Sequence, residues 1–97
     1  MYSLELTESA LEDLRFLKKL EQRYILDMAE RYLSVEPQRP ALNRKPLRPN
    51  DLSAWELRIR EFRVFYDVDA ESRIVLIKAV GWKERNRLLI QGKEYSL

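Results

Sequence analysis

The sequence contains neither cysteine nor histidine. The missing cysteine excludes disulfides and thiol nucleophiles, and the missing histidine removes the side chain that most often acts as general acid or base near neutral pH. Zinc sites built from these two residue types are excluded as well. We therefore expect no bound metal and no small-molecule cofactor, and any acid–base chemistry has to come from other side chains.

Long apolar runs are also missing. No stretch of about 18 consecutive apolar residues occurs, and the N-terminal residues do not resemble a signal peptide. The sequence thus predicts a soluble, cytoplasmic protein with no membrane partner. Its 97 residues, of which 45% are hydrophobic, suffice for one small core, so we expect a single domain over residues 1–97.

Charge is distributed unevenly along the chain, although the net charge is only +2. Residues 1–38 contain 5 basic and 8 acidic side chains, whereas residues 39–97 contain 13 basic and 8 acidic ones. Such asymmetry suits a polyanionic partner bound by the C-terminal part, although many small basic proteins bind none.

The N-terminal third is predicted to be a strand followed by helix. Residues 2–6 alternate between apolar and polar side chains, which indicates a first strand. Helical spacing of three and four then continues over residues 9–33, with Thr7 as a candidate N-cap. No glycine or proline interrupts this segment, which favours one continuous helix over a hairpin broken near Lys18 and Lys19. Its apolar positions are Leu11, Leu14, Leu17, Leu20, Tyr24, Met28 and Tyr32.

All four prolines lie between residues 34 and 51, interleaved with basic side chains. An irregular segment of this length is uncommon in a small domain and is often functional. It either supplies Lys45 and Arg48 to a binding surface or is a proline-stiffened crossover whose basic residues are solvated.

Residues 55–59 and 62–68 each alternate strictly between apolar and polar side chains and flank a two-residue turn. This pattern predicts a β-hairpin that pairs Arg58 with Arg63. A second, shorter hairpin is predicted at the C-terminus around Gly92.

A third strand follows residues 69–72, which we interpret as a four-residue turn. Counting back from this turn pairs Lys78 with Arg63, so that Arg58, Arg63 and Lys78 form one row on one face of the sheet. Like charges placed side by side are unfavourable unless something compensates them. The row is therefore a candidate anion site.

Two alternatives to this row stay open. The face is either solvated, with its cations paired to Glu56 and Asp67, or displaced by a slip of one residue. A slip is a real alternative because neither turn contains the Gly or Asn that would fix the register.

Aromatic side chains are predicted on both faces of the sheet. Trp55, Phe62 and Tyr66 fall on the apolar face, where we expect them to form the core under the helices. Phe65 falls on the charged face, where either a nucleic-acid base stacks on it or a partner protein covers it. For Trp82 the sequence leaves two roles open: it either provides a stacking surface for a base or forms an edge of the core.

Four segments together resemble the RelE/ParE toxin superfamily of type II toxin–antitoxin systems: Lys45-Pro46-Leu47, residues 55–59, residues 62–69 and residues 77–81. The most specific part is the aromatic-Arg-Val-aromatic-Tyr run within residues 62–69, followed by Ala-Val-Gly and a basic segment. The resemblance covers nearly the whole chain. It implies an α+β fold in which an N-terminal strand and a helical region pack on one face of a mainly antiparallel sheet.

The resemblance also implies a function and partners. RelE-like members cut messenger RNA on the ribosome, ParE-like members inhibit DNA gyrase, and a small antitoxin protein silences both. We expect a RelE-like, ribosome-dependent mRNA endonuclease that inhibits translation and is neutralised by a cognate antitoxin. A ParE-like gyrase inhibitor and a catalytically inactive binding module with the toxin fold are the alternatives.

Carried over position by position, the resemblance implies site residues. Arg63 matches the strand arginine that holds the scissile phosphate, and Lys83 and Arg85 match basic positions after the glycine; these three are the predicted catalytic residues. Lysine at position 83 keeps the charge but lacks the bidentate fork of the arginine that RelE-like members usually carry there. The predicted substrate-binding residues are Arg58, Lys78, Phe65, Lys45 and Arg48.

The chain departs from the RelE-like pattern at two places. The tyrosine that these members carry six residues beyond the basic position is Leu89 here, and Ala54 and Glu56 replace basic residues on the strand that carries Arg58. Tyr95 in the terminal hairpin is a candidate substitute for the tyrosine.

Cleavage of RNA through its own 2′-hydroxyl needs a proton acceptor, cations that stabilise the extra charge on phosphate, and a proton donor for the leaving oxygen. Without histidine, the acid–base work falls to Lys83 or to Glu84. The active site of such an enzyme is therefore predicted to be non-standard.

Overall fold

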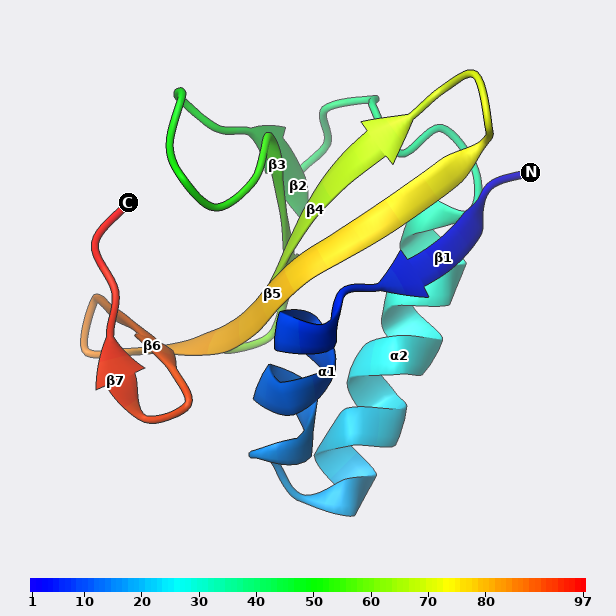
Figure 1. Ribbon diagram of the computed structural model, residues 1–97. Coiled ribbons are helices and arrows are strands. Elements are labelled where there is room, and N and C mark those ends of the chain that lie inside the picture. Colours follow the sequence, from blue (N-terminus) through cyan, green and yellow to red (C-terminus); the bar gives the residue numbers. More distant parts are fainter.

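The computed structural model describes residues 1–97 and places them in seven strands and two helices (Figure 1). In chain order the elements are β1 (Ser3–Leu6), α1 (Glu8–Arg15), α2 (Lys19–Leu33), β2 (Arg44–Pro46), β3 (Trp55–Ile59), β4 (Phe62–Asp69), β5 (Ile74–Glu84), β6 (Arg87–Ile90) and β7 (Lys93–Glu94). Neither helix is long and apolar enough to cross a membrane.

Strand β5 organises the sheet, because its 11 residues pair with three other strands. The strand order is β2-β3-β4-β5-β6-β7, and every pair along this path is antiparallel. β1 lies parallel to the first part of β5, and β6 pairs with its last part, so both occupy the edge opposite β4. The mainly antiparallel sheet expected from the sequence is confirmed.

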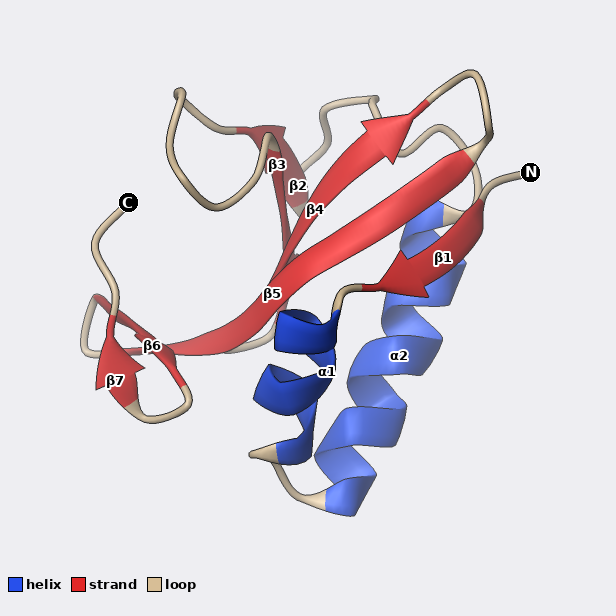
Figure 2. Ribbon diagram, viewed as in Figure 1, coloured by secondary structure: helices blue, strands red, loops and turns tan.

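Both helices cover the same face of this sheet (Figure 2). Alternation along β3 and β4 turns Leu57, Val64 and Tyr66 towards the helices, and all three are fully buried. Trp55 stacks on Tyr66 at the edge of this core, and Phe62 is buried within it, as predicted. The helices fill the core with apolar residues at helical spacing, namely Ala10, Leu14, Ile25, Ala29 and Leu33.

The prediction of one continuous helix over residues 9–33 is wrong, because the helix is interrupted at residues 16–18 and the segment forms two helices. Thr7 caps the first helix as predicted, and its hydroxyl accepts a backbone N–H at 3.1 Å. The second helix starts without glycine or proline. Its first turn is closed by Glu21, whose carboxylate accepts the backbone N–H of Lys18 at 3.1 Å.

Residues 34–54 connect α2 to β3 and contain a strand, β2, that the sequence pattern did not predict. β2 pairs with β3, so that Lys45 lies opposite Glu56. Earlier in the segment, the hydroxyl of Tyr66 donates to the carbonyl oxygen of Pro37 at 2.8 Å. Burial raises the pKa of Tyr66, which keeps this hydroxyl protonated and donating. The proline-rich segment is thus held to the sheet at two points, Pro37 and β2.

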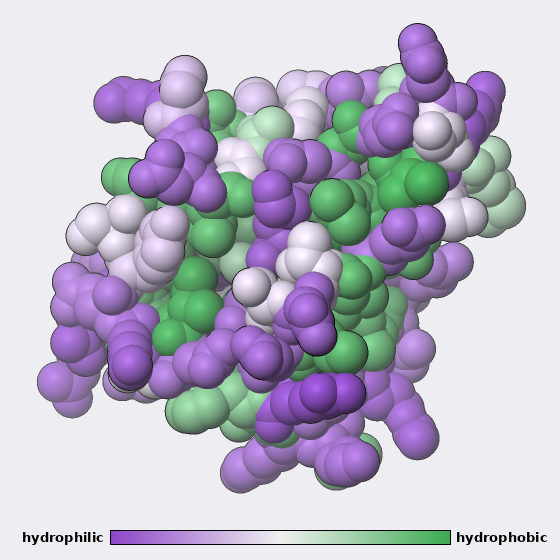
Figure 3. All heavy atoms as spheres, in the orientation of Figure 1, coloured by the Kyte–Doolittle hydropathy of each residue, from purple (hydrophilic) through white to green (hydrophobic).

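A second, smaller apolar cluster lies on the face of the sheet away from the helices. Its buried members are Phe65, Ala79 and Leu88, with Leu47, Leu52, Ile90 and Tyr95 packed around them. Figure 3 shows apolar surface between the segment after β2, the C-terminal residues and the hairpin of β6 and β7. This predicted hairpin is confirmed, although β7 contains only 2 residues. The cluster holds the hairpin against the sheet.

Candidate functional site

Two arginines from neighbouring strands lie directly opposite each other. The turn between β3 and β4 pairs Arg58 with Arg63, as predicted. Arg60 supplies the left-handed conformation that such a short turn needs, with φ of 55°, without being glycine. Because like charges repel at this position, a bound anion between them would be stabilising.

The prediction that Lys78 is the third member of this row is wrong, because Arg63 pairs with Gly81 and not with Lys78. The turn between β4 and β5 comes later than expected, and a β-bulge shifts the register again opposite Phe65 and Tyr66. Lys78 is the extra residue of this bulge. A bulge re-aims the side chain that it inserts, so Lys78 leaves the row.

Two predicted binding residues therefore lie elsewhere. The Nζ atom of Lys78 is 3.5 Å from Oδ2 of Asp67, in a separate groove beside the segment between β2 and β3. Phe65 is fully buried in the second apolar cluster, so it offers no face to a base. The alternative prediction, in which these cations pair with acidic side chains, is correct for Lys78, which pairs with Asp67. Arg63 lies near Glu56 at the longer distance of 3.9 Å.

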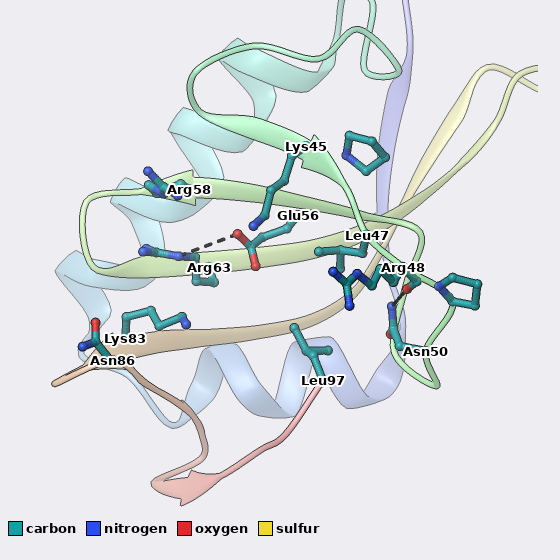
Figure 4. A pocket seen from close by; sticks show the side chains of 12 residues that line it. Lys45, Leu47, Arg48, Asn50, Glu56, Arg58, Arg63, Lys83, Asn86 and Leu97 are labelled. Atoms are coloured by element: carbon teal, nitrogen blue, oxygen red, sulfur yellow. Dashed lines mark hydrogen bonds and ion pairs between the residues drawn. The ribbon is translucent and has the colours of Figure 1, made fainter.

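The other predicted cations converge on one cleft of about 780 Å³ (Figure 4). Each of the strands β2 to β5 contributes to it, as does the segment between β2 and β3. Its charged lining is five cations and one carboxylate: Lys45, Arg48, Arg58, Arg63, Lys83 and Glu56. One carboxylate leaves most of this charge uncompensated. A concave surface of this kind concentrates positive potential and attracts polyanions.

Arg63 is held by the backbone and keeps a donor for a ligand. Its Nη1 donates to the carbonyl oxygens of Arg60 and Phe62, at 2.8 and 2.9 Å. Its Nε is buried without a hydrogen-bond partner, and its Nη2 makes no hydrogen bond within the chain. Burial lowers the pKa of this guanidinium, and Arg58 acts in the same direction while Glu56 opposes it. Nη2 is therefore available to an anion in the cleft.

Glu56 is a functional candidate that nothing in the sequence pattern marks. Its side chain is only 8% exposed, and Oε2 lies 3.9 Å from Nε of Arg63. That separation exceeds hydrogen-bonding distance, so the carboxylate keeps its lone pairs free. Figure 4 shows the Lys45 side chain directed towards the same carboxylate. A proton acceptor thus lies among the cations.

Asn50 holds the segment that presents Arg48 to the cleft. Its Oδ1 accepts the backbone N–H groups of Leu52 and Ser53, at 2.7 and 3.0 Å. Its Nδ2 donates to the carbonyl oxygens of Arg48 and Ser53, at 2.7 and 2.9 Å. These four bonds use both donors and both acceptor positions of the amide. Arg48 therefore stands on a fixed loop.

The turn between β5 and β6 contributes Asn86, and not the predicted Arg85, to the cleft. Both residues have left-handed backbones, with φ of 51° at Arg85 and 66° at Asn86. Asparagine tolerates this conformation well, which is the sequence signal that marks the turn. Tyr95 packs in the second apolar cluster and does not line the cleft, and Leu89 at the missing tyrosine position is buried.

The cleft can therefore bind phosphate groups through cations and accept a proton through Glu56. No group of three or more acidic side chains is arranged to hold a metal ion.

A comparison with protein families gives a match over most of the chain. The family described as "ParE toxin of type II toxin-antitoxin system, parDE" matches residues 4–87. No curated protein matches the chain.

The structure is similar to solved toxin–antitoxin structures. The RelBE2 toxin–antitoxin complex from Mycobacterium tuberculosis is 29% identical, with a TM-score of 0.73 over 84% of this chain and 98% of that one. The intact RelBE complex from Escherichia coli is 25% identical, with a TM-score of 0.66 over 88% of this chain and 100% of that one. A RelE–RelB complex from Pyrococcus horikoshii OT3, at 23% identity and a TM-score of 0.67, supports the fold alone; the match covers 87% of this chain and 97% of that one.

Proposed function

Because this chain belongs to the ParE family of type II toxin–antitoxin toxins, we propose that its cationic cleft is the active site of a RelE-like endoribonuclease. In this proposal the protein acts in the cytoplasm, cleaves messenger RNA on the ribosome and is silenced by a cognate antitoxin. One observation carries the proposal: a guanidinium with a free Nη2 and a carboxylate without hydrogen bonds, Arg63 and Glu56, face the same cleft.

The chemistry assigns a role to three side chains. Glu56 removes the proton of a ribose 2′-hydroxyl, whose oxygen then attacks the neighbouring phosphorus. Arg63 and Lys83 stabilise the negative charge that builds on the phosphate oxygens. The bond to the 5′-oxygen breaks, the ammonium of Lys83 protonates that oxygen, and a 2′,3′-cyclic phosphate remains. No metal takes part in this route.

The other cations of the cleft bind the strand on either side of the reacting phosphate. Lys45, Arg48 and Arg58 lie around the Arg63–Glu56 pair and suit neighbouring phosphates. Such contacts carry no sequence information of their own. Base selection would then come from the ribosome or from contacts outside the cleft.

Inhibition of DNA gyrase is the second candidate function. The matching family is described by the name ParE, and the tyrosine that RelE-like members carry is Leu89 here. Gyrase inhibition needs no general base, so growth arrest would survive the Glu56→Gln change. Supercoiling assays with purified gyrase separate the two functions, because only a gyrase inhibitor lowers their rate.

Expression of the protein alone and with its antitoxin tests the proposed function. Native protein should arrest growth and produce new RNA ends in translated messages, and the Arg63→Ala/Lys83→Ala variant should do neither. A double variant with the same loss of charge outside the cleft, Arg87→Ala/Lys93→Ala, serves as the control and should remain toxic. Unchanged cleavage by the first variant would remove the site.

A further inference from the structure

An aromatic stack lies outside the cleft, at the break between the helices. Phe16 follows α1, and its ring stacks on Trp82 of β5 with 6.0 Å between centroids and 16° between planes. Phe16 is nevertheless 55% exposed. An offset stack of this kind leaves an aromatic surface open to a further ring.

The stack borders a second groove of about 530 Å³ whose charge differs from that of the cleft. Its apolar part also includes Phe62 and Leu17. Its rim carries two lysines and three glutamates: Lys18, Lys83, Glu21, Glu61 and Glu84. A rim with more carboxylates than cations repels phosphate. A neutral, flat ring fits it, since the aromatic surface can stack on the ring and the carboxylates can accept from exocyclic amino groups.

The groove and the cleft share one lining residue, Lys83. Successive residues of a strand point to opposite faces, so Trp82 faces the helix side and Lys83 the cleft side. The end of the sheet between them is fixed, because the backbone N–H of Lys83 donates to the carbonyl oxygen of Glu61 at 2.7 Å. A strand whose phosphate contacts Lys83 can therefore turn its next base over this end.

We infer that the groove beside Phe16 and Trp82 is a nucleobase subsite for the single strand whose phosphates the cleft binds. The inference rests on the proposed RNA-binding function and adds a base contact to it. Stacking accepts any base, whereas the three glutamates favour bases with an amino group, namely adenine, cytosine and guanine, over uracil.

Trp82 provides a direct signal for this subsite. The chain has two tryptophans, and the Trp55→Phe change leaves Trp82 as the sole tryptophan while keeping an aromatic ring against Tyr66. The probe is a short 2′-O-methyl RNA oligonucleotide, which cannot be cleaved through its 2′-oxygen, with an abasic oligonucleotide of the same length as the control. The base-containing oligonucleotide should quench Trp82 fluorescence, and the abasic one should bind without quenching.

Affinity measurements then test Phe16. The Phe16→Leu change keeps apolar contact but removes the aromatic face, and it should weaken binding of the base-containing oligonucleotide about 5- to 150-fold, the range for loss of one stacked base. Leu20→Ala, at an 80% exposed residue outside the groove, is the matched control and should bind as the native protein does.

Four results would overturn the subsite, and they are distinguishable. The subsite is rejected, and RNA binding by the cleft retained, if binding depends on Arg63 but is unchanged by Phe16→Leu. The same conclusion follows if the abasic oligonucleotide quenches Trp82 as strongly as the base-containing one. No oligonucleotide binding by the native protein rejects the RNA-binding function and the subsite together. If Phe16→Leu weakens only rescue by the co-expressed antitoxin, the groove is a protein-docking surface.

Discussion

Glu56 and Arg63 lie diagonally across strands β3 and β4, with 3.9 Å between Oε2 and Nε and no hydrogen bond between them. A buried ion pair offsets the cost of desolvation only when its geometry is good and its remaining donors are satisfied. Here the geometry is loose and Nε has no partner. Such an arrangement costs stability, which is typical of a functional site.

Replacing Glu56 by glutamine should separate binding from chemistry. The change keeps the shape of the side chain, removes the only acidic side chain in the cleft, and leaves no side-chain carboxylate to accept the 2′-hydroxyl proton. Affinity for a non-cleavable oligonucleotide should rise, while the cleavage rate should fall about 10²- to 10⁴-fold. Glu71→Gln, at an exposed glutamate in the turn between β4 and β5 and outside the cleft, is the control and should cleave normally. Cleavage that survives Glu56→Gln would assign the proton transfer to another group.

Two lysines on β5 should behave differently, because the bulge places them in different grooves. Lys83→Ala should weaken RNA binding and reduce the slope of log affinity against log salt by about 0.7, the effect of one lost phosphate contact on a single strand. Lys78→Ala should change neither quantity, since its ammonium group pairs with Asp67. Anisotropy titrations at several salt concentrations measure both. Equal losses would contradict the observed register.

Asp13 should be the main electrostatic support of β5 and the terminal hairpin. Its Oδ2 accepts the backbone N–H of Val80 at 3.1 Å, and its Oδ1 accepts Nε2 of Gln91 at 2.7 Å. Val80 pairs with Val64 of β4 but lies between the parts of β5 that pair with β1 and β6, and its N–H on that side donates to Asp13. Asp13→Ala should lower the free energy of unfolding by about 1–3 kcal/mol, because the N–H is left buried and unpaired.

Chemical denaturation checks this prediction. Asp13→Asn should cost less than Asp13→Ala, since an amide oxygen still accepts one of the two bonds. Asp27→Ala, at an exposed position of α2, should leave the unfolding midpoint nearly unchanged. A result in which Asp13→Ala behaves like Asp27→Ala would show that the two bonds do not support the fold.

Gly81 should tolerate no larger residue. A Cβ atom at this position would overlap the carbonyl oxygen of Leu89 and come within 2.9 Å of the Ile90 side chain, so β5 and β6 would have to separate. Gly81→Ala should therefore lower stability by about 1–3 kcal/mol, the usual cost of overpacking. Thermal unfolding measures the loss, and an unchanged midpoint would contradict the close approach of the two strands.

The parts of the fold that follow local rules were predictable from the sequence. Strict alternation on both sides of residues 60–61 defines the hairpin of β3 and β4, and with it the pairing of Arg58 and Arg63. The register of β5 was not predictable in this way. Its bulge allows Phe65 and Ala79 to enter the second apolar cluster, and that cluster depends on segments far away in the sequence.

The site was predictable only in part for a similar reason. The resemblance to toxins predicted Arg63 and Lys83 as site residues, and both line the cleft. Glu56 was not visible as a site residue, because a lone glutamate on an alternating strand usually faces solvent. Only the pairing of β2 with β3 encloses it. The helix break at residues 16–18 contains neither glycine nor proline, so periodicity alone favours a continuous helix.

The most direct test of the proposal that the cleft cleaves RNA is the mapping of RNA ends in a purified translation reaction. Native protein and the control Arg87→Ala should produce the same new ends, whereas Arg63→Ala should produce them about 10²- to 10³-fold more slowly, the usual effect of losing one group that stabilises transition-state charge. Equal cleavage by the native protein and Arg63→Ala, or no cleavage by native protein that still arrests growth, would contradict the account.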